Sequence, residues 1–273
     1  MPLVTIPDSE SAVLRAGRSG RAYTITLAHP TGPAPEDGYP VLYLLDGHKF
    51  FGTLVEAVRA RCHRPSATGV VPAIIVGIGP EAGEAASRTL DYTPGPQSDG
   101  GDDSETGGAV DFRAFIENEL KPWVGARVAV DRNHQVLIGH SLGGYFVLDT
   151  LVTRPESFHA YVAISPSIWW DRTRLFDGAA ALLRRAAGEA GRRRVMVTVG
   201  EYEEPPEDPN ADLRGTGDRH RQRRMIGNAR DVAERLGGIP GLNMRFQELA
   251  GEDHAWTVPV TLSRSLRFVL APR

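Results

Sequence analysis

One serine of the 273-residue chain, Ser141, lies between glycines in the stretch IGHSLGGYFVLDTL. An apolar run leads into this serine and an amphipathic segment follows it. A strand, a sharp turn and a helix in that order form a nucleophile elbow, in which the serine is strained and small neighbours let the chains pass closely. Gly139 and Gly143 stand at the two tight points. A glycine-rich turn after any strand has the same pattern, so a catalytic serine needs partners elsewhere.

A serine hydroxyl becomes an effective nucleophile only when a base takes its proton. In enzymes built on such an elbow, the chain order is serine, acid, histidine. His159 approaches a strand and His220 lies in an arginine-rich polar run. His254 follows a strand and a short acidic turn and precedes a final helical segment. We therefore expect His254 to be the base.

Candidate acids follow the strand that lies between the serine and the base, in the stretch RRVMVTVGEYEE. A carboxylate there would hold the imidazole in the correct tautomer and stabilise its protonated form. Glu203 is the first choice and Glu201 the second, and Glu204 competes for the same role. Each of the three taken alone also fits a solvated surface residue.

Two backbone amides must stabilise the oxyanion that forms when a serine attacks a carbonyl. One should come from Leu142, directly after the nucleophile, and the other from a loop after an early buried strand. In VLYLLDGHKFF, Gly47 lets the backbone turn inward and His48 would present its amide. An ordinary structural turn would have the same sequence.

The elements that must position these residues alternate between short apolar runs and longer amphipathic stretches, as in an α/β protein with a largely parallel sheet. Helices are expected within 111–123, 144–155 and 221–238 and after His254. The expected strands lie within 21–30, 41–47, 71–79, 135–141, 160–167, 193–200 and 242–250. This α/β pattern, together with the elbow and the chain order serine, acid, histidine, predicts an α/β-hydrolase fold: a central, mostly parallel sheet of about eight strands with helices on both faces.

One core without internal repeats predicts a single domain over residues 1–273. Two polar segments, 95–108 and 205–224, are predicted to be mobile loops near the site. Residues 171–190 are too few for a large lid domain, which favours an open site.

Composition narrows the class of protein. A formal net charge of -3 argues against nucleic-acid binding, and the single cysteine, Cys62, excludes an intrachain disulfide. The N-terminal stretch is unlike a secretory signal, and no apolar run reaches the roughly 18 residues expected of a membrane span. We expect a cytoplasmic protein that acts on a small-molecule ester, with no cofactor, no metal and no obligate protein partner.

Eight stretches between about residue 20 and residue 260 together carry a family resemblance: GRAYTITLAHP, YPVLYLLDG, SRTLDYTP, FIENELKPWV, IGHSLGGYFVLDTL, SPSIWW, VGEYE and DHAWTVP. They resemble the esterase family of α/β hydrolases that contains ferric-enterobactin-type siderophore esterases and S-formylglutathione hydrolase. SPSIWW and DYTP are most similar to the siderophore-esterase branch.

The resemblance implies a triad of Ser141, Glu203 and His254, or a dyad of the serine and the histidine alone. It also implies that Arg88 and Trp170, or its neighbour Trp169, border the substrate. An arginine beside an aromatic wall would suit an anionic aromatic ester. Packing in the core or at the rim would equally explain the tryptophans, and an ion pair with Asp91 would explain the arginine.

The sequence therefore predicts a serine esterase that works through an acyl-enzyme. A siderophore-type ester or lactone, another aromatic ester and a small acyl ester all remain open as substrates. The alternatives are an acyltransferase or a thioesterase on the same residues, or a catalytically silent binding protein.

Overall fold

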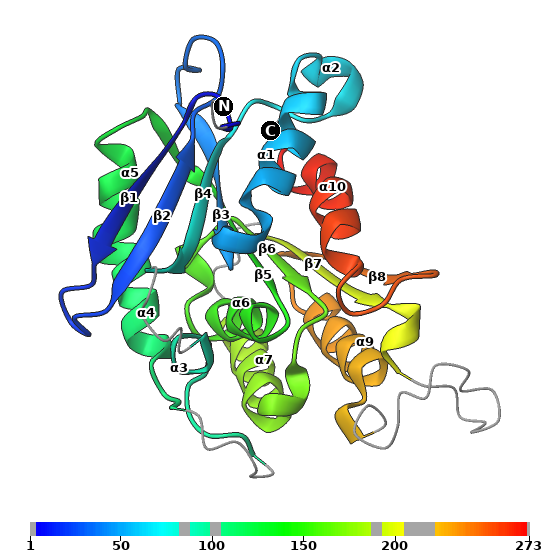
Figure 1. Ribbon diagram of the computed structural model, residues 1–273. Helices are drawn as coiled ribbons and strands as arrows, with labels where there is room; N and C mark the ends of the chain where they lie inside the picture. Colours follow the sequence, from blue (N-terminus) through cyan, green and yellow to red (C-terminus); the bar gives the residue numbers. More distant parts are fainter. Residues whose placement is uncertain (1–3, 82–87, 99–104, 187–192, 205–221, 272–273) are drawn as a thin grey trace.

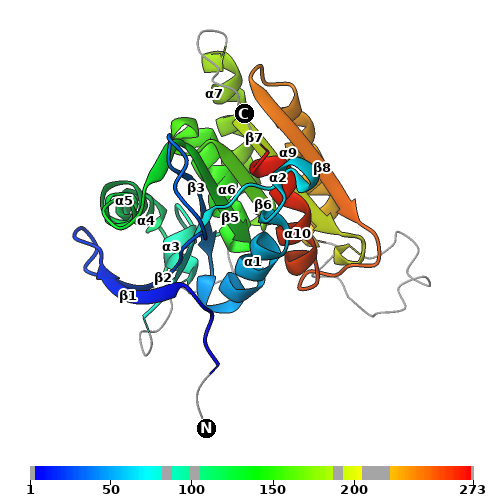
Figure 2. The same cartoon turned by 90° about the horizontal axis from the view of Figure 1, so that it is seen from above.

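The strands of the described chain form one mostly parallel sheet (Figure 1). A computed structural model describes residues 4–81, 88–98, 105–186, 193–204 and 222–271. The strand order is β1-β2-β4-β3-β5-β6-β7-β8. The β1–β2 and β2–β4 pairs are antiparallel and all the later pairs are parallel. The bounds are Ser9–Arg15 (β1), Ala22–Ala28 (β2), Tyr39–Leu45 (β3), Ile74–Pro80 (β4), Val130–His140 (β5), Ala160–Ile164 (β6), Arg193–Gly200 (β7) and Leu242–Leu249 (β8). Seen from above, β1 and β8 lie at opposite ends of the sheet (Figure 2).

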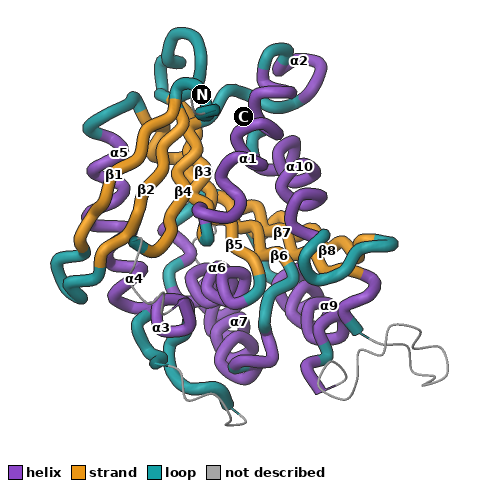
Figure 3. Tube along the Cα trace, viewed as in Figure 1, coloured by secondary structure: helices purple, strands orange, loops and turns teal. Residues whose placement is uncertain are grey.

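Helices cover both faces of the sheet, so the strands form the middle layer of three (Figure 3). One face carries α1 (Gly47–Cys62) and α10 (Thr257–Val269), which also contact each other. The other face carries α4 (Ala109–Phe115), α5 (Lys121–Gly125), α6 (Leu142–Thr153), α7 (Arg172–Ala186) and α9 (Met225–Gly237). The short elements are α2 (Pro65–Thr68), α3 (Arg88–Tyr92), a π-helical turn at Ile116–Leu120, and 3-10 turns at Pro155–Ser157, Ile168–Trp170 and Glu201–Glu203.

The central strands are buried on both faces, which explains why their sequences are continuous apolar runs. In β5, Leu137 packs into the core under α6, whereas Val136 and Ile138 pack into the core under α1 and α10. Helix α6 is buried along most of its length because it lies between the sheet and α7. This packing fixes α6, and with it the turn that joins β5 to α6.

The observed fold confirms the α/β architecture and the strands expected from the apolar runs. The helix expected within 111–123 is part of a longer helical segment that includes the π-helical turn. Residues 99–104 of the first predicted loop and residues 205–221 of the second lie outside the described residues. In the part of the chain that the structure describes, no helix is both long and apolar enough to cross a membrane.

Candidate active site

Three residues with left-handed backbone follow neighbouring parallel strands at the carboxyl edge of the sheet. Asp46 (φ 54°), Ser141 (φ 59°) and Ser165 (φ 43°) follow β3, β5 and β6. Positive φ is uncommon for residues other than glycine, and such strain gathers at functional sites. In open α/β sheets ligands bind outside the carboxyl ends of the strands, which is where these three residues lie.

Ser141 occupies the sharp turn between β5 and α6, with φ 59° and ψ −118°. Its amide donates to the carbonyl of Ile164, which fixes the turn to the next strand. A Cβ at Gly139 would lie 2.4 Å from the carbonyl oxygen of Gly143, so only glycine fits at position 139. A tight point was also expected at Gly143, but a Cβ there would make ordinary contacts of 3.6 Å. The close approach at Gly143 is made by its backbone, which lies against Gly139.

The carboxylate of Glu203 is bound to the imidazole of His254. Glu203 is 2% exposed, and its Oε2 lies 2.6 Å from Nδ1 of His254. Its Oε1 accepts from the hydroxyl of Ser165 at 2.6 Å and from the amide of Gly200 at 2.7 Å. Three donors therefore satisfy this buried carboxylate.

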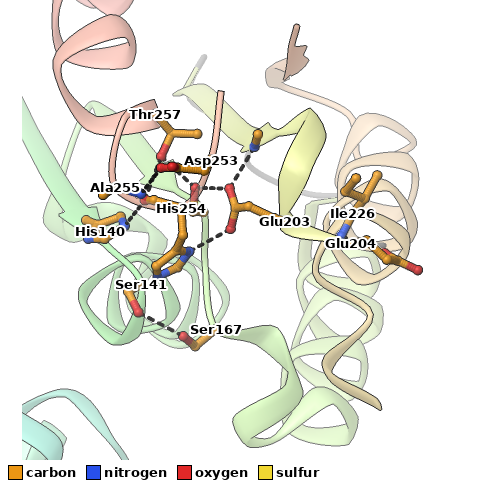
Figure 4. Close-up of polar contacts among 12 residues, drawn as sticks. His140, Ser141, Ser167, Glu203, Glu204, Ile226, Asp253, His254, Ala255 and Thr257 are labelled. Atoms are coloured by element: carbon orange, nitrogen blue, oxygen red, sulfur yellow. Dashed lines mark hydrogen bonds and ion pairs between the residues drawn. The ribbon is translucent and has the colours of Figure 1, made fainter. Parts of the chain in front are cut away.

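This contact sets the tautomer of His254, because an ionised carboxylate can only accept a hydrogen bond. The proton of the neutral ring is on Nδ1, which leaves Nε2 as an acceptor. The imidazole lies between the carboxylate of Glu203 and the hydroxyl of Ser141 (Figure 4). The Ser141 hydroxyl itself is 3.1 Å from the hydroxyl of Ser167.

The two neighbouring glutamates bind elsewhere. Glu201 accepts a hydrogen bond from the amide of Gly251 at 2.7 Å, at an exposed turn. Glu204 accepts from the amides of Ile226 and Gly227, both at 2.9 Å, in the first turn of α9. Of the three competing glutamates, the structure brings Glu203 to the histidine.

A cavity of about 420 Å³ opens beside the serine and the histidine. Trp169 and Tyr202 form part of its wall, and the guanidinium of Arg223 lies 4.2 Å from the centre of the Trp169 ring. Arg223 could not be identified as a site residue from the sequence, because nothing in the arginine-rich run before α9 distinguishes it from its neighbours. Residues that line the cavity include Ser141, Ser167, Trp169, Tyr202, Arg223 and His254.

The other residues that the resemblance places at the substrate lie away from this cavity. Trp170 is 1% exposed, and its indole nitrogen donates to the carbonyl of Gly95 at 3.1 Å. Arg88 donates to both carboxylate oxygens of Asp46, at 2.8 and 2.9 Å, and to the carbonyl of His140 at 2.8 Å. Arg88 therefore joins the loop after β3 to the residue before the serine, whereas Asp91 pairs with Arg21 and not with Arg88.

The two residues expected to supply oxyanion-hole amides lie in the first turns of long helices. His48 belongs to the first turn of α1, and Leu142 is the first residue of α6. Amides in a first helical turn have no partner within the helix and are available to a ligand. A Cβ at Gly47 would lie 2.5 Å from the Cα of Gly77, so glycine lets the start of α1 pass close to β4.

An elbow serine and a glutamate-bound histidine at the carboxyl edge of this sheet define a hydrolase of the α/β-hydrolase fold.

Residues 16–236 match the family described as "Putative esterase". The chain is 38% identical to the ferri-bacillibactin esterase BesA of Bacillus subtilis, over 98% of this chain and 91% of that protein. It is 33% identical to a siderophore triacetylfusarinine C esterase of Aspergillus fumigatus, over 96% and 93% of the two chains. The solved structure of the BES protein from Bacillus cereus superposes with a TM-score of 0.86 at 35% identity, covering 98% of this chain and 97% of that one. The chain belongs to this esterase family and is a serine-type carboxylic ester hydrolase.

Proposed function

We propose that Ser141 is the nucleophile of this esterase, His254 its general base and Glu203 the acid that orients the base. The observation that carries the proposal is the 2.6 Å hydrogen bond between Glu203 and Nδ1 of His254. That bond leaves Nε2 as the proton acceptor, in the cavity that also contains the elbow serine.

In the first half of the reaction, Oγ of Ser141 bonds to the ester carbonyl carbon while Nε2 of His254 takes the hydroxyl proton. The hydroxyl must therefore turn from Ser167 toward the histidine. The amides of Leu142 and His48 would stabilise the oxyanion. When the tetrahedral intermediate collapses, the carbon–oxygen bond to the alcohol breaks and His254 protonates the leaving oxygen.

In the second half, water attacks the acyl ester on Ser141 and gives one proton to His254. The bond between the acyl carbon and the serine oxygen then breaks, and the histidine returns that proton to the serine. The products are one carboxylic acid and one alcohol. Buried Glu203 stabilises the imidazolium in both halves because its charge lies next to Nδ1.

We propose a siderophore-type ester with anionic aromatic arms as the substrate. The names of the two relatives support a siderophore ester, since both are siderophore esterases. The cavity wall supports an anionic aromatic group, because Trp169 and Tyr202 offer rings and Arg223 offers a cation. A catecholate arm combines the two properties that such a wall recognises.

A panel of esters tests the substrate class. The purified protein would be assayed with a ferric catecholate trilactone, the same trilactone without iron, a feruloyl ester, p-nitrophenyl acetate and S-formylglutathione. We expect the highest kcat/KM for a catecholate trilactone. A higher value for S-formylglutathione would overturn the siderophore proposal in favour of a thioesterase, and acyl transfer to an added alcohol would favour an acyltransferase.

A further inference from the structure

His140, the residue directly before the elbow serine, hydrogen-bonds to the backbone of His254. Its Nε2 donates to the carbonyl of His254 at 2.8 Å, because a carbonyl can only accept. The two imidazole rings lie 4.6 Å apart between centroids, and the ring of Phe50 meets His140 edge-on. Figure 4 shows the hydrogen bond from His140, at the end of β5, to His254, in the turn before α10.

A second donor, the hydroxyl of Thr257, also binds this carbonyl. The hydroxyl of Thr257 lies 3.0 Å from the carbonyl of His254. Thr257 is in α10, three residues further along the chain, so its contact is local. The bond from His140 spans 114 positions and joins this turn to the nucleophile elbow.

The backbone of His140 is fixed as well as its ring. Its carbonyl accepts from Arg88, and Arg88 is held by both carboxylate oxygens of Asp46. Asp46 directly precedes the loop expected to supply the second oxyanion amide. His140 therefore contacts the base His254 through its ring, precedes the nucleophile in the chain, and is joined to Asp46 before the oxyanion loop through Arg88.

We propose that His140 is a positioning residue that fixes the backbone of His254 against the nucleophile elbow through its Nε2–H and stays uncharged while His254 carries the proton. This inference rests on the proposed role of His254 as the base. A fixed backbone matters because a misplacement of about 1 Å in an active site can cost about 100-fold in rate. The positioning requires the proton on Nε2 of His140, which leaves Nδ1 as the acceptor.

The charge state follows from the groups that face the ring. Burial is the main cause that lowers the pKa of His140 to about 4, and the neighbouring His254 and Arg88 act in the same direction. The hydrogen bond to the carbonyl of His254 and the charge of Glu203 oppose this lowering without cancelling it. A protonated His140 would place a second positive charge beside the imidazolium of His254. An uncharged ring instead keeps its hydrogen bond and adds no repulsion when the base is protonated.

Two substitutions separate the hydrogen bond from the ring. His140→Phe keeps a planar ring and removes the donor, whereas His140→Gln restores a side-chain N–H that does not titrate. With a p-nitrophenyl ester, we expect the Phe variant to lose about 10- to 100-fold in kcat with little change in KM. We expect the Gln variant to recover most of that loss. Wild-type kcat in the Phe variant, or equal losses in both variants, would overturn the positioning role.

The pH profile of the wild-type protein tests the charge state and does not depend on how the variants fold. With His140 uncharged, log kcat/KM on the acid limb should fall with a slope of one per pH unit down to pH 5. A slope of two would show that His140 titrates together with the base and would overturn the proposal. Thermal unfolding of both variants checks that each is folded. If Ser141→Ala were as active as the wild type, the proposed function would fail instead, and the two failures are therefore distinguishable.

Discussion

Glu203 and His254 share a 2.6 Å hydrogen bond between a carboxylate that is almost fully buried and an imidazole that is 44% exposed. Both residues line the cavity, and the imidazole is the more exposed of the two. The hydrogen bond occupies Nδ1 and leaves Nε2 as an acceptor, as the proposed role of a general base requires. It also separates Glu203 from Glu201 and Glu204, whose carboxylates bind backbone amides outside the pair.

Glu203→Gln should reduce kcat strongly, because an amide in place of the carboxylate stabilises neither the tautomer nor the imidazolium. Loss of the acid in such triads costs up to about 10⁴-fold in kcat. Glu201→Gln is the matched control, since among the described residues its carboxylate binds the amide of Gly251 and not the histidine, and it should stay within about threefold of the wild type. Steady-state kinetics of the two variants decide the assignment. A larger loss for Glu201→Gln would move the role to that residue.

Ser141→Ala should remove ester hydrolysis while the protein stays folded, because the side chain that bonds to the acyl group is gone. A fluorophosphonate probe should label the wild type at Ser141 and leave the variant unlabelled. Ser167→Ala is the matched control: it removes the hydroxyl 3.1 Å away and should still be labelled. An unlabelled wild-type protein would favour a silent binding protein.

The sequence predicted most of the sheet because each central strand is buried on both faces and therefore reads as an apolar run. It did not predict β1, where Ser9–Arg15 is largely exposed and carries few apolar residues. Nor did it predict α1, although Phe51, Leu54, Val55 and Val58 recur there at helical spacing. The start of that helix was interpreted as part of a loop.

The sequence assigned the candidate site residues to particular turns, but it could not show which of several nearby side chains on one turn faces the cavity. Glu201–Glu203 and Ile168–Trp170 are both 3-10 turns, where successive side chains diverge by about 120°. The direction of each side chain depends on how the turn is attached to its strand. Spacing alone could not show that Trp169 lines the cavity while Trp170 is buried.

Arg223→Gln should impair anionic aromatic esters selectively. The guanidinium lies against Trp169 in the cavity wall, so its loss removes a charge contact that a neutral ester does not use. We expect kcat/KM for a catecholate trilactone to fall about 10-fold, equivalent to about 1.4 kcal/mol, with p-nitrophenyl acetate nearly unchanged. Trp169→Leu should act in the same direction. Equal losses on both esters would show that the wall supports the site instead of selecting the substrate.

Stability should depend on pH through His140. Burial and His254 lower the pKa of this ring to about 4 in the folded protein, whereas an unfolded histidine titrates near pH ~6.5. Between these values the unfolded chain binds a proton that the folded protein does not, so the free energy of unfolding falls as the pH drops from about 6.5 to about 4. Urea unfolding at half-unit pH steps would measure this slope. His140→Gln has no ring to titrate and should show a shallower pH dependence in that window, while an unchanged slope would assign the effect to other groups.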